Sequence, residues 1–408
     1  MKNVGFHLFI CFGLIAVSFF YSCGIKKNKP LPYSSAPKYI LNRIPSSEFP
    51  DFLDDMFYDA LEAAIQKSIT YLQIVPENRK FKFGKDTFSA GHLINSLQYF
   101  QNFIHTKPSE KKLKKFIEKK FLVYRSIGRD SDGKVFFTGY YEPALRGSLS
   151  KTYEYRYPVY SRPLDLDEID LSLFSSKFKG EKIMGRYSDV KFIPYYERKE
   201  IEADTVFSEK AKPVAWVNDK VELFFLQIQG SGIIDLDDGT KINVHYNTTN
   251  GRPYKSIGKL LIDQGKISRE NMSMQAIRAY LHKHPDEVDK ILTYNKSYVF
   301  FNIEEDGPLG CLNLKLTPGR SIALDRKIFP SAALGFIATK KPLIDGGGKI
   351  SSWSKFNRFV LNHDTGGAIK GPGRADIFWG TGKYAEVAAG YMQHKGDLYF
   401  IVLKPDLT

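Results

Sequence analysis

Near its C-terminal end the chain has two aspartates, Asp364 and Asp376, separated by a glycine-rich segment. The apolar run 359–361 leads into Asp364, and the apolar run 377–379 follows Asp376. Short apolar runs bounded by turn residues predict β-strands. The segment 370–373, Lys-Gly-Pro-Gly, interrupts the hydrogen-bond ladder of a β-sheet, because two glycines and a proline do not continue a strand. The stretch therefore predicts two strands joined by a loop, with one carboxyl group at an end of each strand.

The residues around these two acids favour acid chemistry. Gly366 and Gly367 permit a ligand or another backbone to approach closely. The aromatic pair Phe378-Trp379 beside Asp376 favours the protonated form of that carboxyl group, because an apolar environment disfavours its charge. A carboxylic acid that keeps its proton near neutral pH can act as a general acid.

Two structural alternatives stay open for the same acids. Asp364 can instead bond the amides of the two glycines that follow it, in an Asx-type turn. Asp376 can pair at the surface with Arg374 or Lys370, and these cations would lower its pKa rather than raise it. The sequence does not decide between these effects.

The N-terminal segment has the pattern of an export signal. A lysine at position 2 precedes the apolar run 6–20, which is too short for a comfortable transmembrane span. Ser22-Cys23-Gly24 follows, so residues 1–22 resemble a bacterial lipoprotein signal that is cleaved before an acylated Cys23. An ordinary secretory signal or a membrane anchor is the alternative. Residues 23–45, rich in lysine, proline and serine, are expected to form a tether.

Cysteine usage agrees with export. Of the three cysteines, Cys11 is lost with the signal and Cys23 would carry lipid, which leaves Cys311 as the single thiol. A disulfide within the mature chain and a thiol-rich metal site are therefore both excluded. The acidic cluster 235–238 lacks the spacing of an EF-hand. We expect no metal and no cofactor.

The charge balance points to a polymer as the binding partner. The formal net charge is +14, and aromatic residues make up 14% of the chain. A basic, aromatic-rich exported protein suits a polyanion or a sugar polymer. Nucleic acid fits the charge but not the compartment, and no nucleic-acid motif is present.

Periodicity predicts helices first, then strands, then a short helical region, then strands again. This order favours a mainly β fold with helical additions. The expected helices are 51–75, 90–105, 109–121, 256–264, 273–282 and 285–293. The expected strands are 135–143, 157–160, 223–232, 241–246 after a turn at 237–239, 298–301, 321–324, 335–338, 359–361 and 398–403.

Several motifs together resemble one family. The segments 364–371 and 375–380 look like the C-terminal three-aspartate domain of the membrane-bound lytic murein transglycosylase A family. The third aspartate would be Asp325, at the end of the segment 317–325. Further motifs extend the resemblance over roughly residues 135–405: Phe137–Pro143, Gln227–Gly232, Asn250–Gly258 and Ser297–Phe301.

The resemblance implies a double-psi β-barrel domain with a smaller inserted β-barrel domain and a groove between them. Residues 46–146 would supply the N-terminal helical part and the first barrel strand. Residues 147–302 would form the inserted domain, and residues 303–408 the three-aspartate part of the barrel.

The family's activity is cleavage of the β-1,4 bond between N-acetylmuramic acid and N-acetylglucosamine, which leaves 1,6-anhydro-N-acetylmuramic acid ends. The resemblance implies that Asp376 is the catalytic acid, that Asp364 orients and polarises it, and that Asp325 supports the site. A single carboxyl group suffices if the sugar's own 6-hydroxyl attacks the anomeric carbon. The candidate substrate-binding residues are Tyr140, Glu142, Gln229, Ser231, Gly366, Gly367, Lys370 and Trp379.

The implied location is the outer membrane, where a lipid on Cys23 would anchor the protein facing the periplasm. The expected partners are peptidoglycan glycan strands, the membrane and other cell-wall enzymes. Three other functions compete with the family's activity. Asp-Thr-Gly at 364–366 also resembles an aspartic-protease signature, which needs two such carboxylates and so a symmetric dimer. A non-catalytic peptidoglycan-binding lipoprotein and a water-using muramidase are the other two.

Overall fold

The computed structural model describes residues 39–129, 132–203 and 207–407. The signal segment 1–22, Cys23 and the tether up to residue 38 lie outside these residues. Within them, Leu41–Arg43 forms strand β1, which pairs with β4 (Phe121–Ser126). The expected tether over 23–45 therefore ends before β1, because Leu41 is 1% exposed and belongs to the core.

Six strands close into a barrel. Their order is β19–β16–β17–β15–β18–β5, and β5 pairs back with β19. The pairs β15–β17 and β18–β5 are parallel, and the others are antiparallel. This barrel confirms the expected mainly β fold. The strands are β5 (Val135–Glu142), β15 (Ser321–Ala323), β16 (Leu334–Ile344), β17 (Ile350–Asp364), β18 (Arg374–Thr381) and β19 (His394–Leu403).

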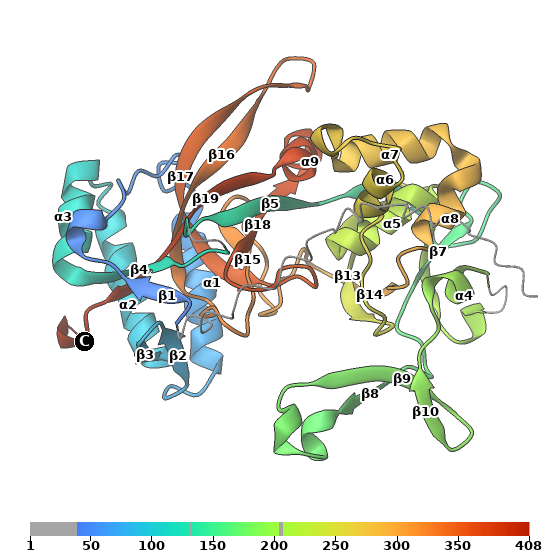
Figure 1. The fold of residues 1–408 in the computed structure, drawn as a ribbon, viewed down its shortest axis with the longest axis horizontal. Helices are drawn as coiled ribbons and strands as arrows, with labels where there is room; N and C mark the ends of the chain where they lie inside the picture. The colour runs from blue at the N-terminus through green and yellow to red at the C-terminus, as the bar shows by residue number, and fades with distance from the viewer. Residues whose placement is uncertain (1–38, 130–131, 204–206, 408) are drawn as a thin grey trace, which may run out of the picture. The chain divides into compact units, whose positions relative to one another are not determined.

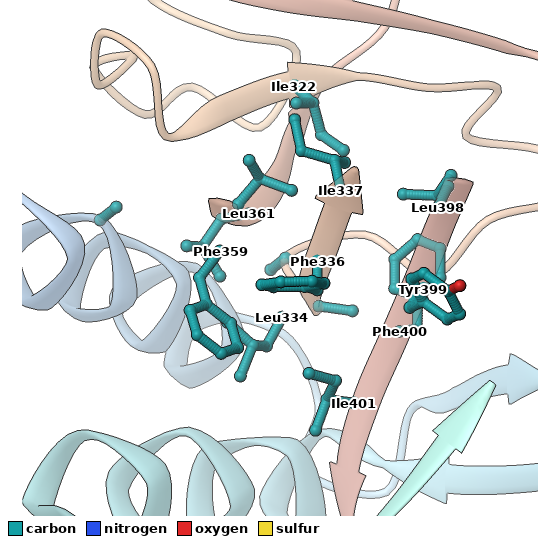
Figure 2. Close-up of a cluster of buried hydrophobic side chains, with 14 of the residues drawn as sticks. Ile322, Leu334, Phe336, Ile337, Phe359, Leu361, Leu398, Tyr399, Phe400 and Ile401 are labelled. Carbon is teal, nitrogen blue, oxygen red and sulfur yellow. The ribbon is translucent and has the colours of Figure 1, made fainter. Parts of the chain in front are cut away.

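The barrel strands share one apolar core (Figure 2). Phe336 on β16 and Phe359 on β17 are fully buried, and their ring centroids lie 4.9 Å apart. Leu361 and Leu398 lie in the same cluster. Burial of one such side chain stabilises a fold by about 1.5–3 kcal/mol. The core thereby fixes the ends of β17 and β18, where the two aspartates lie.

Helices and a hairpin from the N-terminal part pack on this barrel. Helix α1 (Leu61–Ile74) contacts β17, and α2 (Ala90–Ile104) contacts β19. Ser89 caps α2, because its Oγ accepts a hydrogen bond from the amide of His92. The remaining elements here are β2 (Lys80–Phe83), β3 (Asp86–Ser89), α3 (Glu110–Lys120) and, after β18, α9 (Gly382–Tyr391).

The helix predicted over 51–75 is wrong in its first part, since α1 begins only at Leu61. The carboxylate of Asp54 accepts hydrogen bonds from the amides of Met56 and Tyr58 and holds the guanidinium of Arg320 at 2.6 and 2.8 Å. Both members of this ion pair are almost fully buried. The pair imposes turns, including positive φ at Tyr58, that override the helical periodicity.

The inserted domain is built on a separate six-stranded sheet of order β14–β13–β12–β6–β11–β7, whose edge strands β14 and β7 contact each other. Its helices α5 to α8 have their own apolar core, and a three-stranded sheet β10–β9–β8 extends from it (Figure 1). The bounds are β6 (Ala144–Ser148), β7 (Tyr157–Tyr160), β8 (Asp167–Asp170), β9 (Lys182–Ser188), β10 (Lys191–Pro194), α4 (Arg198–Ala203), β11 (Pro213–Val217), α5 (Lys220–Gln229), β12 (Ser231–Leu236), β13 (Lys241–Thr249), α6 (Ile257–Asp263), α7 (Met274–Lys283), α8 (Val288–Leu292) and β14 (Val299–Glu304).

The strand predicted over 223–232 is wrong, because residues 220–229 form α5. Asp219 caps this helix by accepting hydrogen bonds from the amides of Val221 and Glu222, and Gly230 ends it at a φ of +84°. A short, continuously apolar run does not distinguish a buried strand from a buried helix. The N-cap at Asp219 was the signal for a helix.

The other predicted elements are confirmed, although several strands are longer than predicted. Strands β16 and β17 extend well beyond 335–338 and 359–361 as a long hairpin (orange in Figure 1). Their outer parts are polar and exposed, so the apolar pattern did not indicate them. In the part of the chain that the structure describes, no helix is long and apolar enough to cross a membrane.

Candidate active site

Asp364 and Asp376 lie on the two barrel strands that flank β15. Ala323 on β15 is in register with Asp364 on β17 and with Asp376 on β18. Residues in register on neighbouring strands point to the same face of a sheet. The strand β15 therefore separates two carboxyl groups that face the same side.

A bulge in β17 sets the direction of Asp364. Asn362 is in register with Ile322, but Asp364 rather than His363 is in register with Ala323. His363 is fully buried, and its Nε2 and Nδ1 lie 2.8 and 2.9 Å from the hydroxyls of Ser68 and Ser321. Burial lowers the pKa of His363 to about 3, so the ring is neutral. The bulge turns Asp364 toward the face of Asp376.

Asp376 has the properties of a proton donor near neutral pH. The pKa of Asp376 is raised from 3.8 to about 6, chiefly by burial and in smaller part by the negative charge of Asp364. The hydroxyl of Thr138 donates a hydrogen bond of 2.8 Å to Oδ1, and this bond and the Arg374 charge oppose the rise. Burial thus changes the pKa of Asp376 more than the charge of Arg374 does. The sequence alone did not decide between these two effects.

Asp364 is held by two donors from other segments. The hydroxyl of Tyr140 donates to its Oδ2 at 2.8 Å, and the amide of Cys311 donates to its Oδ1 at 2.9 Å. Burial raises the pKa of Asp364, while these two bonds and the amide of Thr365 oppose the rise. Its partners are therefore not the amides of Gly366 and Gly367 that an Asx-type turn would use.

Asp325 lies next to the glycine-rich loop. It is 7% exposed, its Oδ2 accepts a hydrogen bond from the amide of Gly371 at 2.9 Å, and its Oδ1 accepts one from the amide of Lys327. Gly371 has a φ of +77°, which favours glycine. Asp325 therefore connects the segment after β15 to the loop between the two acids.

The other predicted residues of this loop differ in their surroundings. A side chain at Gly366 would come within 2.9 Å of Ile369, so packing alone requires glycine there. Gly367 has open space around it, and Lys370 is exposed. Gly367 and Lys370 are thus free to meet a ligand.

Glu142, at the end of β5, is another carboxyl group with unusual surroundings. It follows Thr138 and Tyr140 at a spacing of two residues, which places all three on one face of the strand. Glu142 is 5% exposed, and its Oε1 is buried without a hydrogen-bond partner. Burial raises the pKa of Glu142 to about 7, although the charge of Lys315 opposes the rise.

Gln229 and Ser231 lie where the inserted domain meets the barrel. The Oε1 of Gln229 accepts a hydrogen bond from the amide of Tyr141 at 3.1 Å and so connects α5 to β5. Ser231 is 7% exposed at the start of β12. The Nε2 of Gln229 donates to the Sδ of Met274 at 3.7 Å, so both ends of this amide already have a partner within the protein.

The structure contradicts the prediction that Trp379 binds the substrate. Its side chain is 7% exposed and packs in the core against Phe356 and Tyr384, at centroid distances of 6.1 and 5.9 Å. It follows Asp376 by three residues, so the alternation of the strand places it on the opposite face. A buried ring on that face has no surface left for stacking on a sugar.

The sequence analysis missed three residues of the site. Thr138 was indicated by its spacing from Tyr140 and Glu142 on one strand face. Arg374 was considered only as a surface partner, yet its Nη2 donates to the Thr138 hydroxyl at 3.3 Å and its Nε is buried without a partner. Cys311 contributes its backbone amide, for which a sequence has no signal.

The described residues include no cluster of three or more potential metal ligands. Cys311 is a free thiol, and burial raises its pKa to about 12. The site thus consists of carboxyl, hydroxyl and guanidinium groups.

Comparisons with known proteins agree with this architecture. Residues 136–302 match the family description of the MltA specific insert domain, and residues 320–402 match the 3D domain. Membrane-bound lytic murein transglycosylase A of Escherichia coli strain K12 is 34% identical over 281 residues, which are 68% of each chain. The chain belongs to the membrane-bound lytic murein transglycosylase A family. It is a lytic transglycosylase.

Solved structures of this family share its fold. A membrane-bound lytic murein transglycosylase from Agrobacterium tumefaciens matches with a TM-score of 0.72 and 28% identity, over 90% of this chain and 98% of that chain. The structure of E. coli MltA with bound chitohexaose matches with a TM-score of 0.68 and 26% identity, over 90% of this chain and 96% of that chain. These likenesses cover both the barrel and the inserted domain.

Proposed function

We propose that this protein cleaves the β-1,4 bond between N-acetylmuramic acid and N-acetylglucosamine in murein, with Asp376 as the single acid and base. The observation that supports this role most directly is the raised pKa of Asp376, about 6, on the barrel face that it shares with Asp364. The similarity to E. coli MltA, whose structure holds chitohexaose, supports a β-1,4 glycan as the ligand.

The reaction needs one proton transfer in each direction. Asp376 donates its proton to the glycosidic oxygen as the bond from that oxygen to the anomeric carbon of muramic acid breaks. The 6-hydroxyl oxygen of the same sugar bonds to the anomeric carbon, and its proton passes to the Asp376 carboxylate. The products are a 1,6-anhydro end and a free 4-hydroxyl, so no water is consumed. General acid–base catalysis of this kind contributes about 10²–10⁴ in rate.

Asp364 acts on this step through charge and position. As a carboxylate it raises the pKa of Asp376 and stabilises positive charge that develops on the sugar ring in the transition state. Its two hydrogen bonds, from Tyr140 and Cys311, favour the charged form and fix its orientation. Asp325 holds the glycine-rich loop through Gly371.

Among the proposed glycan-binding residues, Glu142 is supported best. Its buried, unpartnered Oε1 and its pKa of about 7 allow it to donate or accept a hydrogen bond to a sugar hydroxyl or N-acetyl group near neutral pH. Tyr140 would face the glycan from the same strand face. Gly367 and Lys370 are proposed from the resemblance and their exposed positions. Ser231 is proposed from the resemblance alone, and Gln229 as a residue that also fixes α5.

The relatives are named membrane-bound, and we propose that a lipid on Cys23 anchors this chain in the outer membrane, facing the periplasm. Glycan strands of peptidoglycan are its proposed partner there, together with other cell-wall enzymes. A lipid anchor at this location would hold the enzyme close to its polymer.

Mass spectrometry of purified murein sacculi digested by the mature protein tests the reaction. Anhydro ends are expected. Reducing N-acetylmuramic acid ends would show that water attacks instead, and intact glycan would show that the protein only binds the polymer.

A further inference from the structure

A pocket lies away from the acid site. Its volume is about 610 Å³, and residues at the start of α7, the end of α9 and the beginning of β17 line it. These three elements are labelled in Figure 1. Trp353, Tyr391 and His394 line it, together with Gln275 of α7 and residues of the turn before β17. None of the three aspartates is among its lining residues.

Hydrogen bonds across the pocket hold its walls together. The Nε2 of Gln275 donates to the carbonyl of Glu386 on α9 at 3.0 Å. The Nε2 of Gln393 donates to the carbonyl of Met272 at 3.2 Å. These two bonds connect the inserted domain to the barrel through residues that line the pocket. A ligand would therefore meet a wall that is already formed, which lowers the entropy lost on binding.

The pocket contains polar atoms that the protein does not satisfy. The Oε1 of Gln275 and the Nε2 of His394 are buried and have no hydrogen-bond partner. An unmade hydrogen bond of a buried polar atom costs about 1–3 kcal/mol. Burial and the charge of Lys340 lower the pKa of His394, so its imidazole is neutral and can donate or accept. Both residues line the pocket, so a rotation of either side chain would bring its unpaired atom to the hydroxyl or amide groups of a ligand.

Aromatic side chains supply the rest of the surface. The Trp353 ring lies edge-on to His394, with centroids 4.1 Å apart, and Tyr391 is 39% exposed. The charged side chains at the rim have both signs, since Arg269 and Lys349 stand beside Glu270. This combination favours an uncharged ligand that has apolar ring faces and many hydroxyl groups, which is the chemistry of a sugar.

We propose that this pocket is a second saccharide-binding site, which takes an N-acetylated sugar of a β-1,4 glycan apart from the catalytic site. The identity of the polymer rests on the proposed function. The pocket itself rests on Gln275, Trp353, Tyr391 and His394. A second site would hold another segment of glycan on the enzyme and lengthen its stay on insoluble murein, because two linked contacts dissociate together only rarely.

Titration calorimetry of the mature Asp376→Asn protein with chitotetraose tests the proposal. We expect two binding sites per chain. Tyr391→Ala should reduce this to one, or weaken the second site by about tenfold, because it removes an aromatic face. His394→Gln is the second variant, and it should weaken the same site. Tyr153→Ala is the matched control, since Tyr153 is 96% exposed and does not line the pocket.

Trp353 fluorescence separates this proposal from the proposed function. Chitotetraose should change the emission of the Asp376→Asn protein, and Trp353→Phe should abolish that change while one calorimetric site remains. One site per chain in the Asp376→Asn protein, together with binding unaltered by Tyr391→Ala and His394→Gln, would overturn the second site. Failure of the proposed function would instead appear as missing anhydro products with the Trp353 signal intact.

Discussion

Asp364 and Asp376 flank the single strand β15, and the charge of Asp364 adds to the rise that burial causes in the pKa of Asp376. Burial raises the pKa of Asp364 as well, but the hydrogen bonds from Tyr140 and Cys311 oppose that rise. The two carboxyl groups therefore differ in role although they share a face. In the proposed mechanism, Asp376, which has fewer stabilising bonds, retains the proton and donates it. Asp364, which is bonded by Tyr140, Cys311 and Thr365, would carry the negative charge that the developing cation needs.

The first prediction concerns the Tyr140 hydroxyl. Tyr140→Phe removes the bond that lowers the pKa of Asp364, so that pKa rises further and Asp364 loses part of its charge. Because this charge raises the pKa of Asp376, the pKa of Asp376 falls. The basic limb of the pH–rate profile should move to lower pH. An unchanged basic limb, with kcat lowered equally at every pH, would show a purely structural role.

The second prediction concerns Trp379. Trp379→Ala should destabilise the protein by about 3–5 kcal/mol, because it leaves a cavity in the core between Phe356 and Tyr384. Urea unfolding measures this loss, and Tyr153→Ala, at a 96% exposed position, is the control. Loss of glycan affinity with unchanged stability would place the ring at the glycan instead.

The third prediction concerns the pH dependence of stability. The pKa of Glu142 is about 7 in the folded protein, against 4.5 for an unperturbed glutamate, so the folded protein binds the additional proton between these values. The contribution of Glu142 to the free energy of unfolding is therefore largest below about pH 4.5. It falls by on the order of 3 kcal/mol as the pH rises through 7.

Glu142→Gln should flatten this dependence, because an amide does not titrate. The measurement is urea unfolding of both proteins at about pH 5 and about pH 8. Asp376 has a raised pKa as well and leaves a smaller residual slope of the same sign. Equal slopes in the two proteins would show that Glu142 is ionised in the fold.

How far the sequence predicts this molecule depends on the kind of interaction. The barrel strands around Phe336 and Phe359 were predictable, because their burial produces a local apolar pattern. The bulge at His363 was not, because it depends on hydroxyls of Ser68 and Ser321, which are far away in the sequence. The same holds for the late start of α1, which a buried pair between Asp54 and Arg320 causes.

Within the site, the positions of the two acids were predicted correctly from the sequence, and the position of one aromatic residue was not. Asp364 and Asp376 were expected at strand ends with a loop between them. Asp364 is the last residue of β17, and Asp376 is the third residue of β18. Trp379 was expected at the glycan, although its odd spacing from Asp376 already indicated the opposite face. The pKa of Asp376 required the structure, because burial and Arg374 act in opposite directions.

The fourth prediction concerns the anchor. Cys23→Ser should release a soluble protein or block signal processing, because the lipid would supply most of the membrane affinity. Fractionation of cells and the mass of the N-terminal peptide measure both effects. A membrane-bound variant that is trimmed normally would contradict a lipid at this position.

The central claim is that one carboxyl group performs both proton transfers, and release of 1,6-anhydro-muropeptides from purified sacculi by Asp376→Asn tests it directly. The variant keeps the hydrogen-bonding shape of the side chain but has no transferable proton. The account predicts a loss of at least about 10²–10⁴ in rate with glycan binding retained, and a smaller loss for Asp364→Asn. Near-wild-type release by Asp376→Asn would contradict the account and move the acid to Glu142 or Asp364.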